Sequence, residues 1–255
     1  MRVPLPAAFL TTPLAHRGYH SRADRRPENS PAAFHAAIAA GYGIELDVQL
    51  SRDGQAMVFH DEALDRLTAV AGLVKDFTAA SLARIPLRDS DACILTLPEI
   101  LGLIAGRVPV LIEIKDQTDA MMQTDGRLEL ATAAALDNYI GPVAVMSFNP
   151  HSVAQMARLA PNIARGLTTS AYGDDWEPLN PATRARLRDI PDYDPTLSSF
   201  ISHEAADLSR ARVAALKAEG AAILCWTIRS AQAEAAARTI ADNVTFEGYA
   251  AAKPA

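Results

Sequence analysis

The sequence predicts a (β/α)8 barrel formed by a single domain, residues 1–255. Three observations support this prediction. The chain has 255 residues, close to the roughly 250 that one such barrel needs. Short strand-like segments alternate with helical ones, which indicates βαβ units and a parallel sheet. We count eight candidate strands, the number that closes a barrel, and a doubly wound open sheet is the alternative.

The strand pattern is clearest in the second predicted strand. Ile44, Leu46 and Val48 alternate there with Glu45 and Asp47, and a two-residue alternation is typical of a strand. The predicted strands are 14–18, 43–48, the run that ends at His60, 108–115, 143–148, 163–167, 197–201 and 222–228, and a final strand-like segment covers 244–246.

The predicted helices carry end signals. Ser30 and Pro31 suit an N-cap and a first helical position, and Gly41 ends that helix. Thr96 and Glu99 have the spacing of a capping box. The predicted helices cover 30–41, 79–84, 96–105, 126–138, 182–188 and 204–219, and two more begin after 149–150 and at 230.

Residues 62–87 differ from the rest of the chain. The segment has no strong hydrophobic period and contains Gly72 and Pro86. We therefore expect a small insertion here, after the third strand, with the barrel resuming beyond it. A long loop is expected at 169–195, which is rich in proline and aromatic residues.

The composition predicts a globular protein that has no nucleic-acid partner and does not insert stably into a membrane. The net charge is −6, whereas proteins bind phosphate backbones through clustered Lys and Arg. The N-terminus lacks the apolar core of a secretory signal, and no stretch approaches the roughly 20 apolar residues of a membrane span. We therefore expect a cytoplasmic protein, with Cys93 and Cys225 as buried free thiols. The sequence indicates no oligomeric state.

Glu45 and Asp47 are the main functional signal. Two carboxylates on one face of an apolar strand repel each other and resist burial unless a cation lies between them. Barrel active sites lie at the carboxyl ends of the strands, where Glu113 falls on a later strand. Because carboxylates are hard oxygen ligands, we expect Mg²⁺ or Ca²⁺ rather than zinc.

Four more polar residues fall at predicted strand ends: His16, Arg17, His60 and Lys115. Each alone has an ordinary structural explanation, but together they suit phosphoryl chemistry. A metal polarises a phosphoryl oxygen, the two cations neutralise phosphate charge, and the two histidines act as base and acid. Alternation alone places Arg17 on the face opposite His16, so it reaches the site only if the strand ends there, which Gly18 allows.

Five ordered motifs resemble the glycerophosphodiester phosphodiesterase family, within the phospholipase C-like phosphodiesterase barrels. They are HRG at 16–18, PENS at 27–30, GIELDVQLSRDG at 43–54, VFHDEALDRLT at 58–68 and IEIK at 112–115, with weaker matches at 147–148 and 226–227. The similarity spans nearly the whole chain. It implies a phosphoric diester hydrolase on a (β/α)8 barrel, with a small insertion after the strand that bears the second histidine.

The resemblance also implies a role for each matching residue. Glu45, Asp47 and Glu113 would bind a divalent metal, Mg²⁺ or Ca²⁺, and His16 and His60 would be the general acid/base pair. Arg17 and Lys115 would bind the phosphate, and Trp226 would line the substrate channel. Glu28 and Asn29 would support the site.

The implied reaction is hydrolysis of a small-molecule glycerophosphodiester to sn-glycerol 3-phosphate and an alcohol, as part of lipid and glycerol metabolism. Either water attacks phosphorus directly, or the glycerol 2-hydroxyl attacks first and a cyclic phosphate is then opened. In both routes one histidine takes a proton and the other donates one. The chain departs from the family at ADNVTFEGY, where Glu247 stands at the place of an aspartate and leaves that strand-end contact open.

Three alternatives are set against this interpretation. A lysophospholipase D or phosphoinositide-phospholipase-like enzyme uses the same barrel with an apolar mouth, which the 169–195 loop and Trp176 can supply. A metal-dependent amidohydrolase barrel needs a His-x-His pair on its first strand, and the sequence has none. A non-catalytic binding barrel needs a degraded site, yet all seven expected polar positions are filled.

Overall fold

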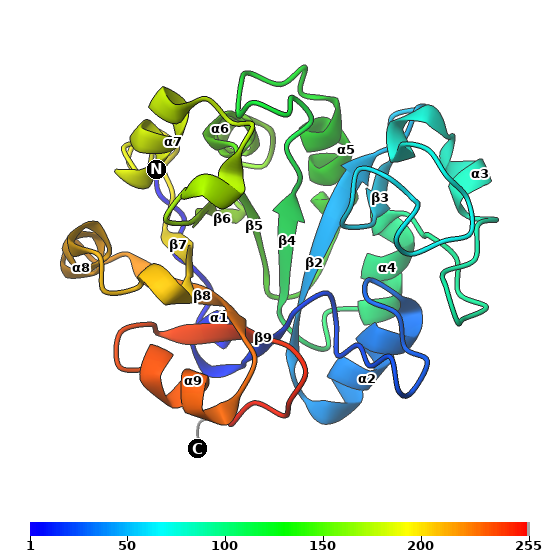
Figure 1. The fold of residues 1–255 in the computed structure, drawn as a ribbon, viewed down its shortest axis with the longest axis horizontal. Helices are drawn as coiled ribbons and strands as arrows, with labels where there is room; N and C mark the ends of the chain where they lie inside the picture. The colour runs from blue at the N-terminus through cyan, green and yellow to red at the C-terminus, as the bar shows by residue number, and fades with distance from the viewer. Residues whose placement is uncertain (254–255) are drawn as a thin grey trace.

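The computed structural model describes residues 1–253 and contains a closed barrel of eight parallel strands (Figure 1). The barrel strands are β1 (Leu14–Ala15), β2 (Gly43–Leu50), β4 (Val110–Ile114), β5 (Val143–Ser147), β6 (Ala164–Thr169), β7 (Phe200–Glu204), β8 (Ala222–Ile228) and β9 (Asn243–Phe246). Each pairs in parallel with its neighbours, and β1 closes the circle by pairing with both β2 and β9. The predicted (β/α)8 barrel is therefore confirmed, and the open sheet is excluded.

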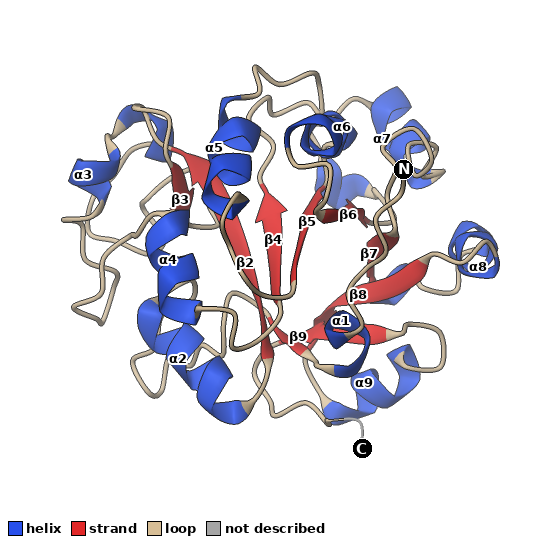
Figure 2. Ribbon diagram, turned by 180° about the vertical axis from the view of Figure 1, so that it is seen from behind, coloured by secondary structure: helices blue, strands red, loops and turns tan. Residues whose placement is uncertain are grey.

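Helices surround the strands (Figure 2). They are α1 (Ala8–Thr11), α2 (Pro31–Ala40), α3 (Ala79–Leu82), α4 (Leu97–Ile104), α5 (Arg127–Leu136), α6 (Pro150–Leu159), α7 (Pro181–Arg188), α8 (Ala211–Ala218) and α9 (Ala231–Ala237). The Ser30 hydroxyl accepts a hydrogen bond from Ala33 N, and Gly41 ends α2 in the left-handed conformation. Thr96 and Glu99 form the expected capping box at α4.

Two apolar layers position the strands. Ile44, Leu46 and Val48 point outward into the core between strands and helices, so the alternation of β2 turns Glu45 and Asp47 into the barrel. A second cluster fills the amino-terminal end of the barrel interior and includes Phe9, Leu14, Leu111 and Phe200. Phe9 comes from α1, a short helix that no sequence signal predicts. The barrel is therefore closed at one end, and its polar interior faces the other.

The run before His60 forms β3 (Ala56–Val58), which is not a barrel strand. It runs antiparallel to the carboxyl-terminal part of β2, with Val48 opposite Val58 and Leu50 opposite Ala56. The eighth barrel strand is instead β9. The expectation that His60 ends a parallel strand is therefore wrong. The hairpin still brings the chain back to the barrel mouth, because Phe59 N donates to Asp47 O at 3.1 Å.

The segment after β3 contains α3 and lies beside β3 in Figure 1, and its apolar side chains form a cluster of their own with those of Met57 and Phe59. Its fully buried members include Leu64 and Leu82, and Ile94 extends the cluster beyond the predicted boundary at residue 87. We refer to residues 62–96 as the insertion. Cys93 is a half-buried free thiol here, and Cys225 is a buried one in β8.

Across residues 1–253, no helix has the length and apolar character needed to cross a bilayer. The cytoplasmic location stays a prediction.

Candidate active site

A cavity of about 580 Å³ opens at the carboxyl ends of the strands. Its lining includes the seven polar residues expected at strand ends: His16, Arg17, Glu45, Asp47, His60, Glu113 and Lys115. Trp226 also lines it, whereas Glu28 and Asn29 lie behind these residues. The structure thus brings together residues that are up to 210 positions apart in the chain.

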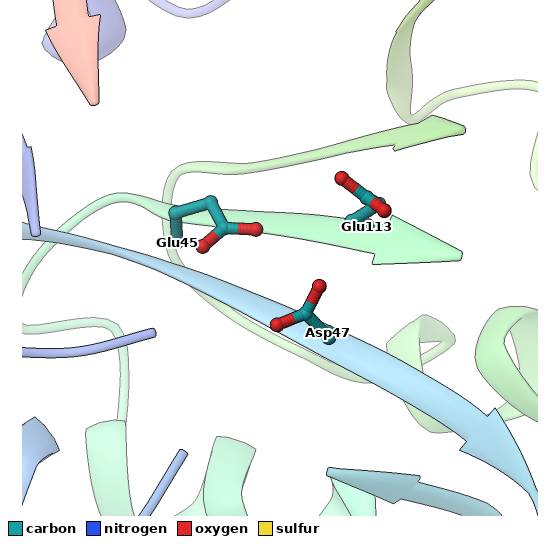
Figure 3. Close-up of side chains that lie close together, drawn as sticks. All are labelled: Glu45, Asp47 and Glu113. Carbon is teal, nitrogen blue, oxygen red and sulfur yellow. The ribbon is translucent and has the colours of Figure 1, made fainter. Parts of the chain in front are cut away.

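Three carboxylates converge at the base of this cavity (Figure 3). Glu45 and Asp47 extend from β2, and Glu113 lies opposite Asp47 on β4. Each offers one oxygen, and these three oxygens lie within 4.8 Å of one another. The residues are 2%, 1% and 7% exposed, respectively, so little water screens their mutual repulsion.

Two cations partly compensate the three acids. Lys115 Nζ donates to Glu113 Oε1 at 2.7 Å and to Asp47 Oδ1 at 3.4 Å, and Arg17 Nε lies 3.6 Å from Asp47 Oδ2. Burial alone would raise the pKa of Asp47, but the charges of Lys115, His60 and Arg17 hold it well below its usual range. Lys115 likewise keeps a raised pKa despite its burial, because Glu113 and Asp47 flank it.

Of the three carboxylates, Glu45 has its negative charge compensated least by neighbouring groups. Among the described residues it accepts one hydrogen bond, from Arg17 N at 3.0 Å, and burial together with the charges of Asp47 and Glu113 raises its pKa well above the ordinary value. Nearby, the buried Asn29 Oδ1 has no hydrogen-bond donor within the described residues. Three converging carboxyl groups, one of them without a side-chain cation of its own, form an oxygen donor set that fits a hard divalent cation.

Arg17 enters the site because β1 ends at Ala15. Arg17 has φ = 53° and Gly18 has φ = 79°, so the chain turns at once after the strand. A Cβ on Gly18 would lie 2.9 Å from Ala33 Cβ, which excludes larger residues. Arg17 can therefore reach the site, because the strand ends before it, as the sequence analysis required.

His16 is held by a carboxylate from the last strand. The pKa of Glu247 lies well below its usual range, first because of the hydrogen bond from His16, so Glu247 is a carboxylate that can only accept. His16 Nδ1–H donates to Glu247 Oε2 at 2.6 Å, and Nε2 lies 4.0 Å from Glu45 Oε2. Burial lowers the pKa of His16 and favours the neutral ring. Glu247 therefore makes the strand-end contact that the sequence left open.

His60 has a matching carboxylate partner. His60 Nδ1–H donates to Asp61 Oδ1 at 2.7 Å. Burial would raise the pKa of Asp61, but hydrogen bonds from His60 and Arg66 hold it well below its usual range. Neither Asp61 nor Arg66 was singled out from the sequence, although both stand in the quoted VFHDEALDRLT motif. The signal available for Asp61 was its adjacency to a strand-end histidine.

Glu28 and Asn29 support the site from behind. Glu28 Oε1 accepts from Arg17 Nη1 at 2.7 Å, and Asn29 Nδ2 donates to Asp47 Oδ2 at 3.0 Å. The Asn29 N–H also donates to Arg17 O at 2.8 Å, which ties the 27–30 turn to the strand-end turn. Both residues contact side chains of the site without lining the cavity.

Aromatic rings form another part of the cavity wall. Trp226 packs edge-to-face on Phe148 with ring centroids 5.5 Å apart, and Phe148 contacts Trp176 at 4.8 Å. Trp226 Nε1 donates to Ser202 O at 3.0 Å, which fixes the indole on β8. Trp176 comes from the 169–195 loop. An apolar surface thus lies in the same cavity as the charged residues.

One protein family matches this chain over nearly all of these elements. The sequence profile of the glycerophosphoryl diester phosphodiesterase family matches residues 16–246. The glycerophosphodiester phosphodiesterase of Caldanaerobacter subterraneus is 35% identical over 164 residues, 62% of this chain and 66% of that protein. The one from Bacillus altitudinis is 34% identical over 169 residues, 63% and 67% of the two chains. The alignments thus span about two thirds of each relative.

A solved structure with a similar fold is the Oleispira antarctica phosphodiesterase in complex with the product sn-glycerol-3-phosphate. It is 24% identical, covers 94% of both chains and superposes with a TM-score of 0.76. At this identity the likeness supports the fold alone.

Proposed function

Because the chain belongs to the glycerophosphoryl diester phosphodiesterase family of phosphoric diester hydrolases, we propose that it hydrolyses glycerophosphodiesters to sn-glycerol 3-phosphate and an alcohol. The observation that carries this proposal is the set of three buried carboxylates in one cavity with His16 and His60. This arrangement would combine a cation site with two proton-transfer groups, a combination that suits phosphodiester hydrolysis.

The three carboxylates, Glu45, Asp47 and Glu113, would hold the divalent metal, Mg²⁺ or Ca²⁺. When bound, such an ion supplies a Lewis acid that polarises a phosphoryl oxygen. Arg17 and Lys115 bind the remaining phosphate charge. Both guanidinium and ammonium stay protonated, since burial is outweighed by the neighbouring carboxylates and their pKa values are raised.

The histidines transfer protons at Nε2. In each ring Nδ1–H is occupied by a carboxylate, Glu247 for His16 and Asp61 for His60, so Nε2 is the nitrogen left for the substrate. One ring takes a proton from the attacking oxygen, which is water or the glycerol 2-hydroxyl, and the other donates a proton to the leaving alcohol. The carboxylates fix the ring orientation and tautomer.

A metal-depleted activity screen tests this function. The EDTA-treated protein is expected to be inactive, and adding back Mg²⁺, Ca²⁺ or Mn²⁺ is expected to restore hydrolysis with at least one ion, because the cation site is assembled from carboxylates. Glycerophosphodiesters with choline, ethanolamine, glycerol and inositol headgroups are compared by a coupled assay for sn-glycerol 3-phosphate. Cyclic glycerophosphate, followed by ³¹P NMR, separates the two routes of attack. Absence of product from every substrate with every ion would overturn the proposal.

The aromatic wall favours a second candidate function. Phe148, Trp176 and Trp226 offer apolar area that an acyl chain can cover, as a lysophospholipase D requires. We expect glycerophosphocholine to be hydrolysed with a higher kcat/KM than lysophosphatidylcholine, measured by choline release below the micelle concentration. The reverse order would favour the lysophospholipase.

A further inference from the structure

Arg66, from the insertion, joins the two sides of the active site. Its guanidinium donates to Asp61 through Nε at 2.6 Å and Nη2 at 3.0 Å. The same group donates to Glu28 through Nη1 at 2.8 Å and Nη2 at 2.7 Å. Arg66 thus makes a two-pronged contact with each of two carboxylates that are 33 positions apart in the chain.

Each carboxylate in turn holds a residue of the cavity. Asp61 accepts the Nδ1–H of His60 at 2.7 Å, and Glu28 accepts from Arg17 Nη1 at 2.7 Å. The result is one continuous chain of hydrogen bonds from His60 through Asp61, Arg66 and Glu28 to Arg17. The Arg66 side chain itself is 47% exposed and does not line the cavity.

We propose that Arg66 is a positioning residue that sets the orientation of His60 and of Arg17 together. This inference rests on the proposed function and extends it, because it gives the insertion a part in the reaction. Without Arg66, Asp61 and Glu28 would be two carboxylates free to rotate toward solvent. His60 would then lose its fixed tautomer, and Arg17 would lose the anchor of its guanidinium.

The fork geometry explains why lysine cannot replace Arg66 fully. The guanidinium presents Nε, Nη1 and Nη2 in one plane, and all three are used. An ammonium is a point charge on a flexible stem and cannot make two bidentate contacts at once. If Arg66 were only a structural cation at the surface, replacing it with lysine would leave the activity unchanged.

Kinetics of Arg66→Met, Arg66→Lys and a control, Arg84→Met, test the proposal. Arg84 is exposed in the same insertion, and its side chain makes no ion pair among the described residues. We expect Arg66→Met to lower kcat/KM by about 10–100-fold. Loss of the fixed orientation of His60 should lower kcat, and loss of the anchor of Arg17 should raise KM. Arg66→Lys should have a kcat/KM between those of Arg66→Met and the parent protein. The kcat/KM of Arg84→Met should stay within about twofold of the parent value.

A second readout does not depend on activity. Imidazole ¹⁵N NMR of the metal-free protein, with His60 assigned from a His60→Gln variant, should report Nδ1–H in the parent and a mixture of tautomers in Arg66→Met. If the parent protein hydrolyses no glycerophosphodiester, the proposed function fails, while this spectrum still tests Arg66. An unchanged tautomer, or equal activity losses in Arg66→Met and Arg84→Met, would overturn the inference.

Discussion

Replacing His60 with glutamine is expected to lower kcat by about 10²–10⁴-fold, the usual contribution of a general acid or base. The His60 ring has one nitrogen committed to Asp61, so Nε2 is its only group available for proton transfer in the cavity. An amide of similar length can fill the space but cannot exchange a proton near neutral pH. Steady-state kinetics with a glycerophosphodiester, in the presence of the best metal, provide the measurement.

Metal affinity gives the control for this variant. His60 is not one of the three residues whose oxygens converge, so calorimetric titration with Mn²⁺ should give an unchanged dissociation constant. His151→Gln is the matched substitution, because His151 is an exposed histidine at the start of α6 and lies outside the cavity. A His60→Gln enzyme with full activity would refute the assignment of His60 to proton transfer.

Replacing Glu45 with glutamine is expected to stabilise the metal-free protein and to abolish most of the activity that added metal gives to the parent protein. Burial and the charges of Asp47 and Glu113 disfavour the ionised Glu45, and glutamine removes that charge but can still accept from Arg17 N. We expect the variant to be more stable than the parent protein at pH 7, because the penalty on the ionised Glu45 is removed. Metal affinity should fall by at least about 10–100-fold, the loss typical even of residues that only support a ligand.

The sign of the pH dependence follows from the raised pKa of Glu45. Below its unfolded pKa of about 4.3 the carboxyl is neutral in both states and the two proteins should be equally stable. As the pH rises from this value to the raised folded pKa, the unfolded parent ionises while burial keeps Glu45 protonated in the folded parent, so the parent loses stability and the advantage of Glu45→Gln grows until it levels off above the folded pKa. Urea denaturation in EDTA from pH 4 to 8 measures it, with Glu219→Gln as an exposed control. A variant less stable than the parent at pH 7 would contradict the repulsion argument.

The barrel could be predicted because its strands carry local signals. The alternation at 44–48 gave both the strand and the inward face of its acids. The hairpin was missed, although a signal existed: only residues 51–55 separate β2 from β3, whereas a parallel connection needs about a dozen residues or more. The seventh strand was placed at 197–201 but lies at Phe200–Glu204, because Leu197 takes a positive φ of 56° in a turn that apolar content alone does not reveal.

The candidate site was predictable where residues share a strand and not where they meet by tertiary folding. Asp47 and Glu113 are register partners on neighbouring strands, and Glu45 lies two residues before Asp47 on the same face of β2, so strand alternation and parallel register bring the three together. Arg66 and Glu247 contact residues that are distant in the sequence, Glu28 and His16 respectively, and these contacts depend on where the insertion and the end of the last strand lie in the folded protein. No periodicity in the sequence records those distances.

The hairpin that carries His60 also bears on how such enzymes diversify. β2 already pairs with β1 and β4, so the circle of strands is complete without β3. His60, proposed to transfer a proton, is therefore carried by an appendage to the barrel, whereas the three carboxylates belong to the barrel strands themselves. A change in the hairpin would alter the chemistry proposed for this site without rebuilding the strands that carry Glu45, Asp47 and Glu113.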